Sequence, residues 1–465
     1  MGKWNCSLKE FVKAVGGHEL STVVDQFSRV GTDTRASLSG QLFIPLKGDR
    51  FDAHDFVPKA VEQGAGVVMV HEWRDDWKPL LGKASFVQVA DTLKALQTFA
   101  LYWRRRHGYQ VAAITGSNGK TSTKEFASAL LTKKLKVHAS QGSLNNHWGV
   151  PISILQADDE ITHLVLEMGM NASGEIFRLC QIAEPNVVVV TTVGRAHIGE
   201  LGSQEKVAAA KEEIYVAAPN AVHIFNLDNE WTMRMAARSS SRKIGFSGFN
   251  PTADVFMRAQ KMTWDGLDLT GHIRTVTGQA LVGVLGRHNV VNLMAASALS
   301  LAFGLTPDEI WKGLGEIKAT AWGRNQILSA TSGARVLFDG YNANPDSMQA
   351  LLKNLYEMEI PGRKFFVVGD MKELGDFSET AHREIGEKAA SIGFQAVWYV
   401  GDYAEAFAAG IKKITPQVQL FQSRDVDPQI AARLAEMVQL DDLVAIKASR
   451  GVALERVLPS FGIRI

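Results

Sequence analysis

The residues best suited to chemistry lie at 115–121, where the chain reads T-G-S-N-G-K-T. The two glycines of this loop allow tight turns that point backbone N–H groups inward. Lys120 supplies a positive charge for the β and γ phosphates, and the hydroxyl of Thr121 can bind Mg²⁺. A strand is predicted just before the loop and a helix just after it, which is the context that phosphate binding requires. We interpret the loop as an ATP site.

This loop is shorter than the general phosphate loop G-x-x-x-x-G-K-[ST], whose first glycine would fall at Ile114. The alternative interpretation is an ordinary turn between a strand and a helix that carries a surface lysine. The strand–loop–helix context favours phosphate binding. The residues predicted to contact ATP here are Thr115, Gly116, Ser117, Asn118, Gly119, Lys120 and Thr121.

Glu167, His197 and Lys211 are candidates for metal binding. Glu167 lies late in a strand predicted at 163–168, where an unpaired acidic side chain is costly to bury, so a cation partner is expected. His197 follows the strand predicted at 186–193, near the sheet edge where parallel-sheet enzymes bind ligands. Each has a simpler alternative, namely a lysine partner for Glu167, a hydrogen-bonded loop position for His197 and a solvated helix face for Lys211.

Short strands alternate with helices along most of the chain, which predicts parallel sheets covered by helices on both faces. The loop belongs to such a run, and a period-two antiparallel meander at 253–284 is expected to extend the same domain. After about residue 319 the rhythm is typical of a doubly wound, Rossmann-like sheet without a G-x-G-x-x-G fingerprint.

The expected fold class is therefore α/β with three domains. They are a small N-terminal α/β domain at 1–90, a central P-loop parallel-sheet ATPase domain at 91–318 and a C-terminal Rossmann-like domain at 319–465.

Composition excludes several other classes of protein. The 465 residues include 50 basic and 49 acidic ones, so the net charge of +1 gives no global field for nucleic acid or an anionic membrane. The two cysteines, Cys6 and Cys180, have no nearby partner that would indicate a zinc motif or a disulfide. The N-terminus lacks an apolar stretch of signal-peptide length, and no run is long enough to span a bilayer. We expect a cytoplasmic protein, and since nothing marks an obligate interface, a monomer.

Several ordered motifs make the chain resemble the Mur ligase family over nearly its whole length. Besides the loop, they are N-N-H-W-G-V-P at 145–151, L-E-M-G at 166–169, H-I-G-E-L-G-S-Q-E at 197–205, G-R-H-N-V-V-N at 286–292, G-R at 323–324, D-G-Y-N-A-N-P at 339–345 and K-A-S-R-G at 447–451. The resemblance implies an ADP-forming amide ligase of peptidoglycan precursor synthesis, which activates the carboxylate of a UDP-linked peptide as an acyl phosphate.

Three further motifs indicate which substrates to expect. T-D-T-R at 32–35, F-D-A-H-D-F at 51–56 and G-D-M-K-E-L-G at 369–375, followed by His382, are most similar to the family member that adds D-alanyl-D-alanine to UDP-N-acetylmuramoyl-tripeptide. The resemblance implies that the N-terminal domain binds the UDP substrate. The C-terminal domain would close over ATP and bind the amine substrate.

The resemblance also implies roles for individual residues. Thr121 and Glu167 would hold one Mg²⁺ and His197 a second, helped by Lys211 as a site of carbamylation by CO₂. The implied catalytic residues are Lys120, His197, Lys211 and Arg324. Further nucleotide contacts are implied for Asn289, Arg324, Asp339, Tyr341, Asn342, Asn344 and Pro345, and contacts to the UDP end of the substrate for Asp33, Thr34 and Arg35.

Two alternative functions stay open from the sequence. One is another Mur-type amino acid ligase, or a folylpolyglutamate-type ligase, on the same scaffold, which substrate swapping in one phosphate-release assay would distinguish. The other is a nucleotide-gated binding module without ligation chemistry, which would bind ATP and yield no amide product.

Overall fold

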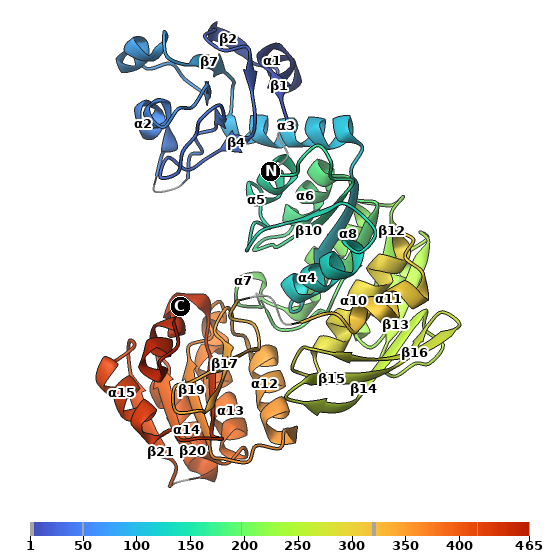
Figure 1. The fold of residues 1–465 in the computed structure, drawn as a ribbon, viewed down its shortest axis with the longest axis vertical. Helices are drawn as coiled ribbons and strands as arrows, with labels where there is room; N and C mark the ends of the chain where they lie inside the picture. Colours follow the sequence, from blue (N-terminus) through green and yellow to red (C-terminus); the bar gives the residue numbers. More distant parts are fainter. Residues whose placement is uncertain (1–3, 49–50, 197, 319–321, 416, 465) are drawn as a thin grey trace. The chain divides into compact units, whose positions relative to one another are not determined.

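The computed structural model describes residues 4–48, 51–196, 198–318, 322–415 and 417–464. Its strands form a two-stranded pair and three larger sheets of five, six and nine strands (Figure 1). The chain divides into two compact units. The first comprises Met1–Thr115, Lys134–Val188 and Glu213–Val222, and the second comprises Gly116–Lys133, Val189–Glu212 and His223–Ile465. The three-domain boundaries at 90 and 318 stay predictions.

The five-stranded sheet has the order β2-β7-β6-β5-β4 and mostly parallel pairs. Apolar side chains such as Phe43, Val68 and Phe86 pack with Val57 of α2 in one buried cluster. The elements of this part of the chain are β1 Cys6–Ser7, α1 Leu8–Val15, β2 His18–Ser21, β3 Gln26–Phe27, β4 Val30–Gly31, β5 Leu42–Phe43, η1 Ala53–Phe56, α2 Val57–Glu62, β6 Val67–Val70, η2 Asp75–Leu80, β7 Ser85–Gln88 and α3 Thr92–His107.

The nine-stranded sheet has the order β16-β15-β14-β13-β12-β11-β8-β10-β9. Its β8–β10, β12–β13 and β13–β14 pairs are parallel, and β14, β15 and β16 form an antiparallel meander. The elements are β8 Gln110–Thr115, α4 Lys120–Leu131, β9 Val137–Ala139, α5 Gly149–Leu155, β10 His163–Glu167, α6 Glu175–Ala183, β11 Val187–Val190, α7 Ile198–Leu201, α8 Gln204–Val216, β12 Val222–Asn226, α9 Glu230–Arg238, β13 Lys243–Ser247, β14 Val255–Thr263, β15 Gly266–Ile273, β16 Val276–Val282, α10 Asn289–Ala302 and α11 Pro307–Leu314.

The six-stranded sheet has the order β17-β18-β22-β19-β20-β21 and is covered on both faces (Figure 1). Alternate strand residues such as Phe366 and Tyr399 pack against α12, α13 and α14, while Phe365 and Trp398 pack against α15 and η5. The elements are β17 Gln326–Ser329, β18 Arg335–Asp339, α12 Pro345–Glu357, β19 Lys364–Gly369, η3 Gly375–Phe377, α13 Ser378–Ala390, β20 Phe394–Val400, α14 Ala404–Ile414, β21 Gln419–Ser423, α15 Pro428–Met437, β22 Leu443–Lys447, η4 Arg450–Val452 and η5 Leu454–Phe461.

The predicted fold class is confirmed, including the strand before the loop, the helix after it and the antiparallel meander. Several strands were not predicted, among them β2, β7, β9, β13 and β17. β13 lies in a segment whose only apolar residues are Ile244 and Phe246, and β17 is a four-residue strand that pairs antiparallel with β18 at the sheet edge. Both are too short for a periodic pattern to identify them.

Candidate functional site

The loop after β8 has neighbouring side chains packed closely against its two glycines. Gly116 has a φ of 149°, and a Cβ added there would lie 2.0 Å from Oγ1 of Thr191. Gly119 has a φ of 84°, and a Cβ there would lie 2.0 Å from Oδ1 of Asn292. Both the left-handed backbone and the neighbouring side chains therefore exclude any residue larger than glycine.

Asn289, which was predicted to contact the nucleotide, supports the loop from behind. Its Nδ2 donates to the carbonyl of Leu285 at 2.7 Å, and its Oδ1 accepts from Nδ2 of Asn292 at 2.8 Å. This pair holds the Asn292 side chain against Gly119. The contact of Asn289 with a nucleotide stays a prediction.

Lys120 and Thr121 open α4, so the helix begins directly at the loop. The Nζ of Lys120 donates to the carbonyl of Gly116 at 2.9 Å, which curls the side chain back over the loop. Nη2 of Arg324 donates to Oγ1 of Thr121 at 2.9 Å. A helix N-terminus, an ammonium and a guanidinium thus lie together, which is an arrangement suited to the charge of a polyphosphate.

Two amide side chains fasten the segment D-G-Y-N-A-N-P to the loop. Asn344 caps α12, which has Pro345 in its first turn, and donates from Nδ2 to Oδ1 of Asn118 at 2.7 Å. The guanidinium of Arg324 stacks 4.2 Å above the ring of Tyr341. Residues some 200 positions apart in the sequence therefore share one site.

Asp339 ends β18 and is paired with a buried lysine. Nζ of Lys447 lies 2.5 Å from Oδ2 of Asp339 and donates to the carbonyl of Asn342 at 2.9 Å. The backbone N–H of Asn325 donates to the other carboxylate oxygen at 3.3 Å. The ion pair fixes the backbone at Asn342, and the predicted nucleotide contacts of Asp339 and Asn342 stay predictions.

Glu167 is buried at the carboxyl end of β10, where the register pairs it with Ile114 of β8. Nδ2 of Asn145 donates to its Oε1 at 2.9 Å. The prediction that Glu167 lies late in a strand is thus confirmed. A carboxylate is an oxygen ligand of the kind that Mg²⁺ prefers.

Lys211 is only 1% exposed, so the alternative of a solvated helix face is wrong. Burial, and then the charge of Lys120, lower the pKa of its amine well below the ordinary value. Within the described ranges, no hydrogen bond or ion pair engages its Nζ. The lowered pKa favours the neutral form of the amine, which is the form that reacts with CO₂.

The ligand set for a metal therefore fits in part. The Thr121 hydroxyl and the Glu167 carboxylate are oxygen ligands of the kind Mg²⁺ prefers, and a carbamate on Lys211 would add two more oxygens. In the part of the chain that the structure describes, no group of three His, Cys, Asp or Glu side chains is arranged to hold a metal ion. His197, predicted for a second ion, lies outside the described residues.

Asp33, Thr34 and Arg35 were predicted to contact the UDP end of a substrate. Arg35 donates from Nε and Nη2 to Oδ2 of Asp33 at 3.0 and 2.6 Å, and this hydrogen bonding lowers the pKa of Asp33 to about 2. The Arg35 side chain is 85% exposed and Thr34 is buried. The pair is a charged, accessible surface of the first unit, and its substrate contact stays a prediction.

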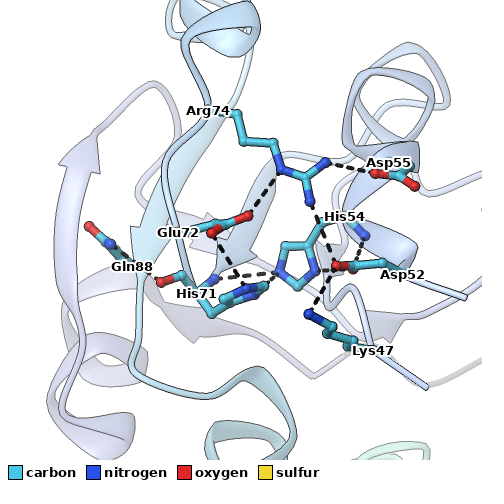
Figure 2. Close-up of polar contacts among 8 residues, drawn as sticks. All are labelled: Lys47, Asp52, His54, Asp55, His71, Glu72, Arg74 and Gln88. Carbon is cyan, nitrogen blue, oxygen red and sulfur yellow. Dashed lines mark hydrogen bonds and ion pairs between the residues drawn. The ribbon is translucent and has the colours of Figure 1, made fainter. Parts of the chain in front are cut away.

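A chain of polar groups surrounds the buried His54 near β6 in the same unit, and Figure 2 shows how its members point toward one another. Nδ1 of His54 lies 2.6 Å from Oδ1 of Asp52, and its Nε2 lies 2.8 Å from Nδ1 of His71. Arg74 lies 3.6 Å from Asp52 and 2.7 Å from Asp55. The chain ties the F-D-A-H-D-F segment to the end of β6.

His54 is fully buried within this chain of groups. Burial lowers its pKa, and although the hydrogen bond with Asp52 acts in the opposite direction, the lowering prevails. The ring is therefore neutral at pH 7, with Nδ1–H directed to the Asp52 carboxylate. Because the two histidines lie 17 residues apart on different elements, sequence spacing did not reveal the network.

A pocket in the second unit contains functional candidates that were not assigned a role from the sequence. The phosphate loop contributes Ser117 and Lys120 to its wall, and the six-stranded sheet contributes three loops. They belong to the motifs D-G-Y-N-A-N-P, G-D-M-K-E-L-G and K-A-S-R-G, and most of their lining residues had no individual role predicted from the sequence. The residues without a prior role are Ala196, Ala343, Lys372, Glu373, Leu374, Ser449, Arg450 and Gly451.

The fold and this site define a P-loop nucleotide-binding protein whose phosphate loop is completed by loops of a Rossmann-like sheet. Comparison with known proteins agrees. Residues 26–104 match the family described as "Mur ligase family, catalytic domain", residues 114–300 match "Mur ligase middle domain", and residues 323–450 match "Mur ligase, glutamate ligase domain".

Individual relatives are similar over almost the whole chain. The UDP-N-acetylmuramoyl-tripeptide–D-alanyl-D-alanine ligase of Bacillus subtilis (strain 168) is 35% identical over 429 residues, which cover 92% of each chain. The crystal structure of MurF from Acinetobacter baumannii has a TM-score of 0.88, 29% identity and 99% coverage of each chain. MurF ligase from Thermotoga maritima in complex with ADP has a TM-score of 0.77 and 28% identity, covering 93% of this chain and 96% of its own.

This chain belongs to the Mur ligase family. The family resemblance predicted from the motifs is thereby confirmed, and ATP is its nucleotide substrate. As for membrane association, none of the helices within the described ranges has the length and apolar character to cross a bilayer.

Proposed function

We propose that this protein joins D-alanyl-D-alanine to UDP-N-acetylmuramoyl-tripeptide, with ATP converted to ADP and phosphate. The relatives from Bacillus subtilis and Escherichia coli that carry this activity in their names support the choice of substrates. One structural observation supports the chemistry most directly. Arg324 and Asn344 hydrogen-bond to Thr121 and Asn118 of the phosphate loop, so groups from two sheets converge where a γ-phosphate would lie.

The reaction requires activation because a carboxylate is a poor electrophile. An oxygen of the tripeptide carboxylate attacks the γ-phosphorus of ATP, the bond to the β-phosphate oxygen breaks, and an acyl phosphate and ADP form. The amine of the dipeptide then attacks the acyl carbon, the amine proton is lost, and inorganic phosphate leaves. Lys120, Arg324 and the loop N–H groups stabilise the charge that develops on the transferred phosphoryl group.

Mg²⁺ would supply further neutralisation of the phosphate charge when bound. Thr121 and Glu167 provide oxygen ligands for one ion, and His197 and Lys211 are assigned to a second. The lowered pKa of the Lys211 amine supports carbamylation, because the neutral nitrogen attacks CO₂ and loses a proton to give an anionic carbamate. The modification reverses the charge at this position and makes it a ligand for a cation.

The remaining assignments follow from the substrates. ATP and UDP-linked precursors are cytoplasmic compounds, so we assign the protein to the cytoplasm. We assign Asp33, Thr34 and Arg35 to the UDP end of the tripeptide substrate. A monomer suffices for the proposed reaction, since each assigned residue belongs to the same chain, and no nucleic acid takes part.

Phosphate release from ATP tests the proposal. The purified protein should release phosphate rapidly only when UDP-N-acetylmuramoyl-tripeptide and D-alanyl-D-alanine are both present, and mass spectrometry should detect the amide product. Replacing the pair by a folate and glutamate, or the dipeptide by single amino acids, tests the other ligases of this scaffold. Equal phosphate release without either substrate would show a different ATPase, and ATP binding without any product would show a binding module.

A further inference from the structure

The pocket that contains Lys120 is also lined by charged residues of the six-stranded sheet's loops. Its volume of about 240 Å³ suits a small ligand, because pockets for drug-sized ligands enclose about 300–1,000 Å³. Lys120 lies on its wall, so a ligand in the pocket adjoins the place where the acyl phosphate forms. Lys372, Glu373 and Arg450 line the same pocket and bring charges of both signs. A pocket wall that carries charges of both signs suits a zwitterionic ligand.

Arg450 is held in a way that leaves most of its donors available. Its Nη1 lies 2.8 Å from Oε1 of Glu455, whose side chain is 16% exposed. The Arg450 side chain is 58% exposed, and no partner of its Nε or Nη2 is found among the residues that the structure describes. A guanidinium fixed at one nitrogen keeps an edge that can bind a carboxylate with two parallel hydrogen bonds.

The backbone around Arg450 is fixed by hydrogen bonds from buried side chains. Oγ of Ser449 accepts from the N–H of Lys372 at 2.9 Å and donates to the carbonyl of Ala343 at 3.2 Å, which joins the loops of Ser449 and Lys372 to the D-G-Y-N-A-N-P segment. Oδ2 of Asp370, 1% exposed, lies 3.1 Å from Nζ of Lys372. The two cations are therefore positioned before any ligand binds.

Nε2 of His382 accepts from the N–H of Met371 at 2.9 Å, and its Nδ1 donates to the carbonyl of Ser378 at 2.6 Å. Glu373 follows in the same loop with a φ of 66°, a strained conformation for a residue with a side chain. Such strain persists where surrounding contacts determine the backbone, which is the case here. The loop that presents Lys372 and Glu373 is thus built rigidly.

We propose that Arg450, positioned by Glu455, binds the terminal carboxylate of the dipeptide substrate and so determines that the amine substrate must end in a free carboxylate. Lys372 adds positive charge at the same end, and Glu373 offers the opposite charge to the ammonium group. The inference rests on the proposed function and adds the residues that recognise the second substrate.

Steady-state kinetics with D-alanyl-D-alanine and with its C-terminal amide test the inference. Arg450→Met should raise the KM for the dipeptide about 10- to 100-fold, the range for losing charged hydrogen bonds. The KM for the amide should change little, so the variant loses the preference of the wild type for a free carboxylate. Arg450→Lys should restore part of the affinity, and Arg178→Met, a change at an exposed arginine of α6, should match the wild type. Equal effects on both substrates, or none, would overturn the inference.

Trapping the acyl phosphate with hydroxylamine separates this inference from the proposed function. With ATP and the UDP-tripeptide alone, wild type and Arg450→Met should form the hydroxamate at similar rates, which also shows that the variant is folded. No hydroxamate from the wild type would refute the proposed function itself. If Arg450→Met fails to fold because Glu455 loses its partner, the double variant with Glu455→Gln removes both charges and should show the same loss of preference.

Glu455→Gln alone tests the positioning role. It should raise the KM for the dipeptide less than Arg450→Met does and leave kcat within about twofold, and adding it to Arg450→Met should have no further effect on KM. Additive effects of the two changes would show that Glu455 acts independently of Arg450 and would contradict the positioning role.

Discussion

The glycine at 119 offers a sharp test of how the phosphate loop is built. In Gly119→Ala the new Cβ would lie 2.0 Å from Oδ1 of Asn292, whereas ordinary contact begins at 3.4 Å, so one of the two groups must move by more than 1 Å. The left-handed φ of 84° adds strain of roughly 1–2 kcal/mol for any residue with a Cβ. Overpacking typically adds about 1–3 kcal/mol. We expect a total loss of about 2–5 kcal/mol of unfolding free energy.

Gly174 provides a matched control within the same chain. It also occupies the N-cap position of a helix, its φ is 87°, and an added Cβ would meet nothing within 4 Å. Gly174→Ala should therefore carry only the backbone strain of roughly 1–2 kcal/mol. The difference between the two variants measures the collision with Asn292 alone.

Thermal unfolding and ATP kinetics give the two readouts. A displacement of 1 Å in a catalytic loop costs about 100-fold in rate, so kcat/KM for ATP should fall by roughly that factor in Gly119→Ala and stay within about threefold in Gly174→Ala. The double variant Gly119→Ala with Asn292→Ala removes the side chain that the new Cβ would contact, so it should recover part of the lost stability and activity. If Gly119→Ala resembles Gly174→Ala in both readouts, Asn292 does not constrain the loop and the reasoning is refuted.

Three further predictions concern other parts of the molecule. Lys211→Ala should abolish ligation while Lys211→Glu keeps a measurable fraction, because only the latter restores an anion; full activity of the alanine variant in the phosphate assay would contradict the assignment. In Asn344→Ser the serine still caps α12, but its shorter side chain cannot reach Asn118. The KM for ATP should therefore rise about 5- to 10-fold, as expected for the loss of one hydrogen bond, while the melting temperature stays nearly unchanged. An unchanged KM would show that the contact with Asn118 is dispensable. The pKa of His54 is lower in the folded than in the unfolded state, so as the pH falls the unfolded state takes up a proton at a higher pH than the folded state does. The free energy of unfolding should therefore decrease as the pH falls below 6.5. Thermal melts from pH 7.5 to 5 should show a smaller decrease in melting temperature for His54→Gln than for the wild type, and equal decreases would refute the role of His54.

Much of the fold follows from local pattern. The strand and the helix on either side of the loop at 115–121 were predicted correctly, because its glycines, Lys120 and Thr121 are adjacent in the sequence and flanked by apolar and helical patterns. Glu167 was predicted late in a strand for the same reason, and it ends β10. Features determined by neighbouring residues in the sequence are those that periodicity and motif spacing reveal.

The rest depends on contacts between distant segments. Nothing in the sequence around Lys211 indicates that a helix reading A-A-A-K-E-E-I buries its lysine, because burial is set by what packs on the helix. The pairing of Arg450 with Glu455 and the joining of Lys372 to Ser449 likewise arise only when the loops of the six-stranded sheet come together. The motifs were visible in the sequence, while the direction in which each side chain points was not.

Transfer of oxygen isotope tests the central claim most directly. UDP-N-acetylmuramoyl-tripeptide labelled with ¹⁸O in its terminal carboxylate is incubated with the protein, ATP and D-alanyl-D-alanine, and the released phosphate is analysed by mass spectrometry. Because the carboxylate oxygen that attacks phosphorus leaves with the phosphate, the account predicts one ¹⁸O in each phosphate and one in the new amide. Unlabelled phosphate formed together with the amide product would contradict activation through an acyl phosphate.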